Sequence, residues 1–389
     1  MKVDRQQLIN DGFLILREVV PPENLPALRA SYETLIEREG GREWLSQGAQ
    51  PRINIIPHID ETTADAVEIW LHENTLGVSR RLLCVGDAAA VTDMVSMCSP
   101  LEDHGPAAWH RDIHPIDMAP MRLLQLDMLE NGPRYVQWNI PLYDDDVLWA
   151  VPGSHRRLNT PQENEELLAD PRAPLTGGVP IELKAGDAIV YINFMLHWGS
   201  NYSSKLRRTL HGGHALFSVN KGIACAPHLS PTARDLFSRF DQQKVQAQNA
   251  TEAALRAILD RDAGAYYAAL ETLQPGAGPA GQLVLTIYLC KAVQLMRIAT
   301  GAEMGEVAER LKDVAAGGHP ITLNWGPAFA DRFTATELEE LWQRCRYIDS
   351  RLLNTEEYFV PGYQSGPMQY FFEDITDPFQ ASDFVASWS

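Results

Sequence analysis

The feature that most constrains the fold of this chain is the segment Trp109-His110-Arg111-Asp112, taken together with His197 far downstream. In a β-strand, His110 and Asp112 point to the same face because successive side chains alternate. A second histidine can return to that face from a neighbouring strand. Two histidines and one carboxylate on one face of a β-barrel form the facial triad of non-haem Fe(II) oxygenases, which leaves coordination positions open.

The same three residues also fit a plainer interpretation. The histidines would then be core or surface residues with satisfied hydrogen bonds, and Asp112 would cap a turn. The other motifs along the chain decide between the two interpretations, because a short motif is convincing only in its structural context.

Five segments, in this order, resemble the phytanoyl-CoA dioxygenase family of Fe(II)/2-oxoglutarate oxygenases. They are Asp11-Gly12-Phe13-Leu14-Ile15-Leu16, Trp109-His110-Arg111-Asp112, Val151-Pro152-Gly153-Ser154-His155, Leu183-Lys184-Ala185-Gly186-Asp187-Ala188, and the run from His197 through Ser200, Asn201 and Ser203 to Arg207-Arg208. Each segment alone is a weak signal, but their common order is a strong one. The resemblance covers about residues 4–220. One departure is Asp144-Asp145-Asp146-Val147, which stands where the family usually has Asn-Gly.

This resemblance implies an α+β fold, with a double-stranded β-helix (jelly-roll) core, buttressing N-terminal helices and an additional C-terminal helical region. It implies that His110, Asp112 and His197 hold Fe(II), with 2-oxoglutarate as co-substrate and O2 as oxidant. Arg208 would bind the distal carboxylate of 2-oxoglutarate, since a guanidinium fork holds a carboxylate bidentately. Its neighbour Arg207 points the opposite way in a strand and suits a surface salt bridge.

Further contacts to the co-substrate are expected on a neighbouring strand. Gln137 and Asn139 face the same side of that strand, and in the family a polar residue here often helps to hold 2-oxoglutarate. The alternative is that this face is simply solvated. Ser200 and Tyr191 are further candidates. His114 would point to the same face as His110 and Asp112 if its strand continues, and it would then lie at the rim of the cavity.

The expected reaction is hydroxylation of an aliphatic carbon of a small molecule, with release of succinate and CO2. Halogenating relatives lack the carboxylate ligand, so the presence of Asp112 favours hydroxylation or a related oxidation. Desaturation, ring closure and C–P or C–N cleavage stay open, because they depend on the pose of the substrate. Two alternatives stay open: a non-catalytic jelly-roll binding protein, and a cupin-like metal dioxygenase that does not use 2-oxoglutarate. The sequence does not identify the substrate, because one fold supports many substrates.

Composition narrows the class of partner. The formal net charge of −18 argues against nucleic acid or an anionic membrane as the main partner, since both require a basic face. The polar N-terminus has no apolar signal core, and the longest apolar run ends at Lys291, too short to span a bilayer. We therefore expect a cytoplasmic protein acting on a small molecule, with a homodimer as a further possibility.

The cysteines are scattered along the chain and indicate neither disulfides nor a zinc site. They are Cys84, Cys98, Cys225, Cys290 and Cys345.

Hydrophobic periodicity and turn residues predict the elements. Helices are expected before the barrel at residues 22–38, 64–71 and 77–86. Strands are expected at residues 136–140, 188–194 and 209–217, with an acidic surface insertion at 161–174. Helices are expected again at residues 236–249, 251–263, 282–299, 305–315 and 335–352, followed by an irregular aromatic tail at 358–388. We predict an oxygenase domain at residues 1–225 and a helical extension at 226–389 that serves as a lid, substrate wall or dimer interface.

Overall fold

The structure is a computed structural model that describes residues 1–113, 119–199, 202–218, 223–358, 360–363, 368–370 and 373–388. The chain forms two compact units. The first, here the jelly-roll unit, comprises Met1–Asp112, Pro133–Asp241 and Val360–Gln364; the second, here the helical unit, comprises Ile113–Gly132, Gln242–Phe359 and Ser365–Ser389. The domain boundary that the sequence suggests, after residue 225, stays a prediction.

The jelly-roll unit is built on a six-stranded sheet in which neighbouring strands run antiparallel. The strand order is β1-β7-β4-β9-β3-β2. These strands are β1 (Phe13–Leu16), β2 (Arg52–Asn54), β3 (Ala90–Cys98), β4 (Tyr135–Pro141), β7 (Ala188–Tyr191) and β9 (Arg208–Ala215). The strands expected from alternation and β-branched runs are therefore confirmed, with the second and the third of them ending earlier than predicted.

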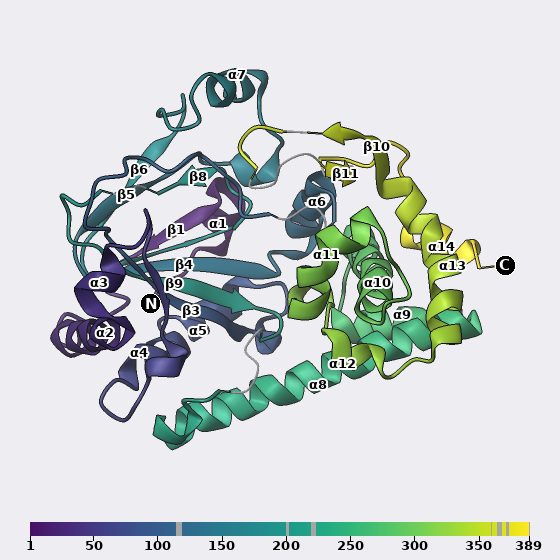
Figure 1. Ribbon diagram of the computed structural model, residues 1–389, viewed down its shortest axis with the longest axis horizontal. Coiled ribbons are helices and arrows are strands. Elements are labelled where there is room, and N and C mark those ends of the chain that lie inside the picture. The colour runs from purple at the N-terminus through teal and green to yellow at the C-terminus, as the bar shows by residue number, and fades with distance from the viewer. Residues whose placement is uncertain are drawn as a thin grey trace. The chain divides into compact units, whose positions relative to one another are not determined.

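A smaller antiparallel sheet, in the order β6-β5-β8, faces the first. It consists of β5 (Asp145–Ala150), β6 (Val179–Leu183) and β8 (His197–Trp198). Figure 1 shows it above β4, β9 and β3. One apolar cluster joins Leu148 and Ile181 of the small sheet to Ile189 and Tyr191 of the large one, so the core lies between the sheets. The predicted α+β jelly-roll fold is confirmed.

The two faces of β9 contact different layers. His214 hydrogen-bonds through Nδ1 to Ser79 Oγ at 2.8 Å and through Nε2 to the carbonyl of Trp70 at 2.9 Å, so its face of the strand points outward to the N-terminal helices. His211 has the opposite parity and bonds Asn139 across the strand pair at 2.7 Å. The face of β9 that carries His211 is therefore the inner face of the barrel.

The N-terminal helices cover the outer face of the large sheet, as the sequence predicts. Leu35 and Ile36 of one helix are buried, and Ile36 packs on Cys98 of β3. Tyr32 on the same helix donates its hydroxyl to the carbonyl of Ala66 at 3.1 Å. The helices are α1 (Arg5–Asp11), α2 (Leu25–Glu39), α3 (Gly41–Leu45), α4 (Asp65–Glu68) and α5 (Leu76–Leu82).

Two of the family motifs meet at one joint of the barrel. Gly12 adopts a φ of +90°, and a Cβ atom there would lie 2.5 Å from Nδ1 of His155. The amide of Gly153 donates to the carbonyl of Asp11 at 2.9 Å. His155 is fully buried and contacts the carbonyl of Ile9 through Nε2. These residues thus hold the barrel together at this joint.

The helical unit is organised around α10, in which every residue from Leu283 to Met296 is buried. Its other helices are α6 (Met121–Asn131), α9 (Ala263–Leu273), α11 (Glu306–Gly317), α12 (Pro327–Ala330), α13 (Ala335–Leu352) and α14 (Ala381–Ala386), and α10 itself covers Pro279–Ala299. The strands β10 (Leu353–Tyr358) and β11 (Met368–Tyr370) pair with one another. The predicted helix at residues 335–352 is confirmed, with Thr334 and Glu337 forming a capping box.

Several elements differ from expectation, and the tail expected to be irregular contains β11 and α14. The helices predicted at 236–249 and 251–263 are one helix, α8 (Pro231–Asp260), because Thr251 continues it and bonds the carbonyl of Ala247. The sequence patterns did not predict α6 inside the β-rich region or α9 in the C-terminal region. The acidic insertion forms a helix, α7 (Pro161–Ala169), whose N-terminus is capped by Thr160 and Glu163.

One helix among the described residues, α10, is long and apolar enough to cross a membrane by length and composition alone. However, 83% of its apolar window is buried inside the helical unit. This burial is typical of a core helix in a folded domain, which passes the same test.

Candidate active site

His110, Asp112 and His197 come together in the jelly-roll unit, with one ligand atom from each lying within 4.8 Å of the others. Nε2 of His110 is 3.4 Å from Oδ1 of Asp112, and Nε2 of His197 is 3.4 Å from Oδ2. His197 is buried, and the other two side chains are about a quarter exposed. Two imidazole nitrogens and one carboxylate thus converge on one point, a donor set that fits Fe(II).

Backbone pairing brings the two histidines together. His110 and His197 exchange two backbone hydrogen bonds, at 2.9 and 3.0 Å, as an antiparallel bridge. Each imidazole bonds a backbone carbonyl through Nδ1, that of Ala108 at 2.8 Å and that of Met195 at 2.7 Å. Because a carbonyl oxygen only accepts, Nδ1 is the donor in each ring, and Nε2 is the nitrogen that would bind a metal in the neutral imidazole.

Asp112 is held in place by groups on the large sheet. Gln137 Nε2 donates to its Oδ2 at 2.9 Å and to the hydroxyl of Tyr191 at 2.7 Å. Asn193 bonds the backbone of Asp112 in both directions. Burial opposes ionisation of Asp112, but the charge and hydrogen bonds of the two neighbouring histidines outweigh it and hold the pKa of that carboxyl well below its usual range.

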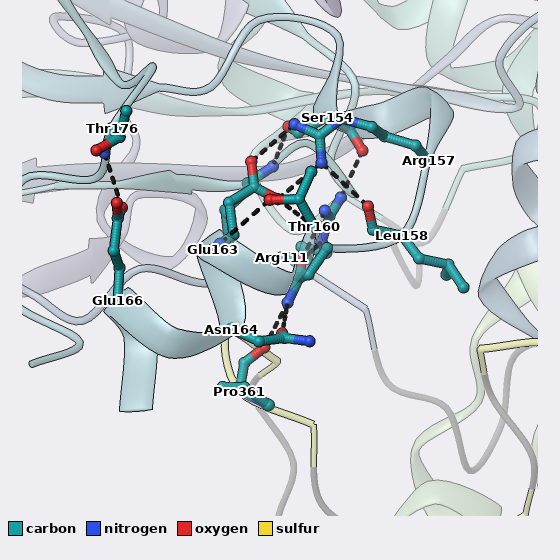
Figure 2. A network of polar contacts seen from close by, with 12 residues as sticks. Arg111, Ser154, Arg157, Leu158, Thr160, Glu163, Asn164, Glu166, Thr176 and Pro361 are labelled. Carbon is teal, nitrogen blue, oxygen red and sulfur yellow. Dashed lines mark hydrogen bonds and ion pairs between the residues drawn. The ribbon is translucent and has the colours of Figure 1, made fainter. Parts of the chain in front are cut away.

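Arg111, between the two motif ligands, turns away from them and anchors the segment. Its side chain is fully buried, and Nη1 donates to the carbonyls of Ser154 and Phe194, each at 2.8 Å. Nη2 donates to Oδ1 of Asn159 at 2.8 Å, and Asn159 in turn bonds the carbonyl of Pro361. Figure 2 shows Arg111 among the polar groups of this network, with Ser154 and Pro361. The first part of the tail, Val360–Gln364, therefore belongs to the jelly-roll unit.

Asn139, the second candidate on β4, lies on the inner face beside Gln137. Its Oδ1 is 2.7 Å from Nδ1 of His211, so that imidazole donates through Nδ1 and presents Nε2 as an acceptor. Burial lowers the pKa of His211 to about 3, which keeps the ring neutral at physiological pH. No motif predicts a role for His211, although its parity with Asn139 follows once the register of β9 and β4 is known.

The structure does not bring Arg208 to the triad, and this prediction is wrong. Arg208 lies on the same face of β9 as His214, the face that points outward. Its guanidinium binds Glu33 of α2, with Nε 2.9 Å from Oε1. Arg207 alternates with Arg208, so it faces the inside of the barrel, and it is buried. Its Nε donates to Oδ2 of Asp145 at 2.9 Å. The inward-facing arginine is therefore one residue earlier than predicted.

Asp145 adds a second carboxylate to the inner end of the barrel. Its Oδ2 accepts from Arg207 and from the hydroxyl of Thr209, each at 2.9 Å, and its Oδ1 accepts from the amide of Val147 at 3.0 Å. Burial alone would raise the pKa of Asp145, but the Arg207 charge and these hydrogen bonds have a larger effect in the opposite direction. The pKa is therefore lower than usual and the carboxyl stays ionised.

Arg52 is an inward-facing cation that sequence reasoning also missed. It pairs with Met97 of β3, which pairs in turn with Thr209, so these three residues share the inner face. Its guanidinium donates to Oε1 of Gln50 from Nε at 3.1 Å and from Nη2 at 2.5 Å. No motif marks Arg52, and only the register of the edge strand reveals it.

Two of the predicted residues, Ser200 and His114, lie outside the described residues. Of the other candidates, the triad, Gln137, Asn139 and Tyr191 line the same inner face or touch one another there. Arg208 alone among the described candidates points elsewhere.

Residues 9–209, just over half of the chain, match the phytanoyl-CoA dioxygenase (PhyH) family. The chain belongs to this family, which confirms the resemblance seen in its motifs. The matched segment includes all three residues of the triad as well as Arg207. No curated protein matches the sequence.

Solved structures resemble part of the chain. AviO1 from Streptomyces viridochromogenes Tue57 is 21% identical and aligns over 55% of this chain and 96% of its own, with a TM-score of 0.40. HygX from Streptomyces hygroscopicus, with nickel and 2-oxoglutarate bound, is 16% identical over 56% of this chain and 89% of its own, with a TM-score of 0.41. EctD from S. alaskensis, with bound Fe, is 15% identical and aligns over 57% of this chain and 78% of its own, with a TM-score of 0.39.

Proposed function

We propose that this protein is an Fe(II)/2-oxoglutarate-dependent dioxygenase that hydroxylates an aliphatic carbon of a small-molecule substrate. The observation that carries the proposal is the convergence of two Nε2 atoms and one carboxylate on a single point in a PhyH-family jelly roll. Each ligand is held by a second group: a backbone carbonyl for each histidine, and Gln137 for Asp112. Such support is typical of metal ligands.

The residues of the chain have distinct tasks in this proposal. His110, Asp112 and His197 hold the iron by three ligands, which leaves positions for a chelating co-substrate and O2. Iron and 2-oxoglutarate, when bound, supply the oxidising chemistry, with succinate and CO2 as products. The protein orients the two substrates and excludes water.

We assign the distal carboxylate of 2-oxoglutarate to Arg207. Its side chain is 7% exposed and lies on the inner face, two residues before Thr209 on the same face. Among the described residues, Nε is the one guanidinium nitrogen of Arg207 with a protein acceptor, so the Nη1–Nη2 edge can receive a carboxylate. Asn139 and His211 line the same inner face.

The carboxylate ligand Asp112 argues against halogenation, which requires an open position in its place, and favours hydroxylation or a related oxidation. A cytoplasmic location, a small-molecule substrate without nucleic acid or membrane as partner, and a homodimer complete the proposal. The exclusion of nucleic acid and of an anionic membrane rests on the acidic composition.

Succinate formation from 2-oxoglutarate tests this function directly. Wild-type protein with Fe(II), O2 and 2-oxoglutarate is expected to produce succinate, and Asp112→Ala is expected to abolish it. Asp146→Asn, a change at an exposed aspartate, serves as the control. Equal succinate formation by Asp112→Ala would contradict the proposal. Oxygen consumption without succinate, unaffected by Arg207→Ala, would instead favour a metal dioxygenase that does not use 2-oxoglutarate.

A further inference from the structure

Asp145 occupies an unusual position beside the proposed co-substrate anchor. It is the first residue of β5, on the sheet opposite to Arg207, and its side chain is only 8% exposed. Three donors fix its two oxygens: Arg207 Nε, the Thr209 hydroxyl and the Val147 amide. The carboxylate is therefore a rigid part of the site and cannot turn away without breaking all three bonds.

The neighbouring aspartates behave differently, although the three are consecutive in the sequence. Asp144 is exposed and pairs with Lys184, and Asp146 is exposed and pairs with Lys205. Only Asp145 turns inward. This acidic run is the segment that departs from the family pattern, so the inward carboxylate is a feature of this chain rather than of the motif set.

The pairing changes what Arg207 offers to an anion. A ligand carboxylate at the Nη1–Nη2 edge would share one guanidinium with Asp145, so two anions would lie close together with a single positive charge between them. Like charges at such short range in a protein interior alter a binding constant by about tenfold or more. The opposing effect is the loss of the hydrogen bond by which Asp145 orients the guanidinium, and the sign of the measured change in Kd decides between the two.

We propose that Asp145 acts as a built-in counter-charge that weakens the hold of Arg207 on the distal carboxylate of the co-substrate and so sets its affinity. This inference rests on the proposed function and deepens it. The same carboxylate stabilises the protein before the co-substrate binds, because it neutralises a buried cation. Asp145 therefore acts in opposite directions on stability and on co-substrate affinity.

The test measures both quantities on the full chain. Anaerobic Fe(II)-loaded protein is titrated with 2-oxoglutarate, and the Kd is read from the visible charge-transfer band; the thermal midpoint of the apo-protein is measured separately. Asp145→Ala and Asp145→Asn are expected to bind 2-oxoglutarate about tenfold more tightly or better, and to unfold at lower temperature. Asp144→Asn and Asp146→Asn, the exposed neighbours, are the matched controls and should change neither quantity appreciably.

A purely structural role for Asp145 would weaken binding and stability together, so an unchanged or raised Kd in both Asp145 variants overturns the inference. The Kd for Fe(II) reports whether the variants keep the metal site, and it should match that of wild type. In an Arg207→Ala background, Asp145→Ala should no longer alter the Kd for 2-oxoglutarate, because the effect acts through Arg207.

Failure of the inference and failure of the proposed function are distinguishable. If wild type binds 2-oxoglutarate but Arg207→Ala binds it equally well, another residue binds the distal carboxylate. The inference on Asp145 is then wrong, while the proposed iron-dependent function is unaffected. If Fe(II)-loaded wild type gives no band with 2-oxoglutarate, the proposed function falls and the inference falls with it.

Discussion

Gln137 donates a hydrogen bond from Nε2 to Oδ2 of Asp112 at 2.9 Å, across the space between the large sheet and the metal-binding segment. The same nitrogen donates to the hydroxyl of Tyr191. Gln137 thus fixes the carboxylate orientation that a metal ligand requires.

Substitution of Gln137 should therefore weaken iron binding. Gln137→Leu is expected to raise the Kd for Fe(II) by roughly 10- to 100-fold, the usual effect of losing a group that orients a ligand. An anaerobic titration against a competing chelator measures it. Tyr191→Phe, which removes only the other partner of the amide, is the control and should have a smaller effect. An unchanged Kd in Gln137→Leu would show that Asp112 needs no such support.

Arg111 should be essential for stability rather than for chemistry. Arg111→Met removes the donors to the buried carbonyls of Ser154 and Phe194, and we expect a loss of about 3 kcal/mol in the free energy of unfolding. Urea unfolding measures this loss. Arg172→Gln, at an exposed arginine of the same unit, is the matched control. Wild-type stability in Arg111→Met would contradict the anchoring role.

Gly12 should not tolerate a side chain. Gly12→Ala places a Cβ atom 2.5 Å from Nδ1 of buried His155 at a φ of +90°, and a loss of about 2 kcal/mol or more in stability is expected. Urea unfolding of Gly12→Ala and Gly48→Ala measures the difference. Gly48 is the matched control, since it also has a positive φ, +77°, but nothing lies within 4 Å of the position that its Cβ atom would take. Equal losses in the two variants would show that backbone strain, not the contact with His155, sets the cost.

Buried histidines should make the protein sensitive to mild acid. Burial lowers the pKa of His214 to about 4, whereas an unfolded histidine titrates near 6.5. The unfolded state therefore binds a proton first, and stability falls as the pH drops from about 6.5 toward 4. At pH 5 this one residue should account for a loss of about 2 kcal/mol.

Unfolding in urea at pH 7 and pH 5 measures this loss. His214→Gln is expected to be less stable at pH 7, because Ser79 and the Trp70 carbonyl each lose their hydrogen bond to the imidazole, but to lose less on acidification than wild type. His72→Gln, at an exposed histidine, is the control. A variant whose loss between the two pH values equals that of wild type would show that His214 is not responsible.

The sequence is sufficient for the fold class and for the triad, because both follow from ordered motifs and from the period-2 alternation of strands. It does not decide which of two adjacent arginines faces the site. The face to which a strand residue points depends on the register of the strand with its neighbours. That register cannot be deduced from the sequence, because a loop separates His197 from Arg208. His211 and Arg52 escape prediction because they join the site through cross-strand pairing, which a local pattern does not contain. Asp145 escapes it because it joins the site through side-chain hydrogen bonds to Arg207 and Thr209 of the opposite sheet.

Helix boundaries are predicted poorly where the local signal is weak. Asn249 and Thr251 suggest a break, yet α8 continues through them because neither residue is a strong helix breaker and no Pro or Gly interrupts the run from residue 232 to 260. The helix α6 is hidden within a region whose surroundings are β-rich. Tertiary packing, which single-sequence propensity does not capture, decides both cases.

The most direct test of the central claim is an anaerobic titration of the apo-protein with Fe(II) and then 2-oxoglutarate, followed by the visible metal-to-ligand charge-transfer band. We predict that the band forms in wild type and in Arg208→Ala, is weakened in Arg207→Ala, and is lost in Asp112→Ala. If Fe(II) binds but no band forms in wild type, 2-oxoglutarate is not chelated and the proposed enzyme class is wrong. If iron does not bind at all, His110, Asp112 and His197 do not form a metal site.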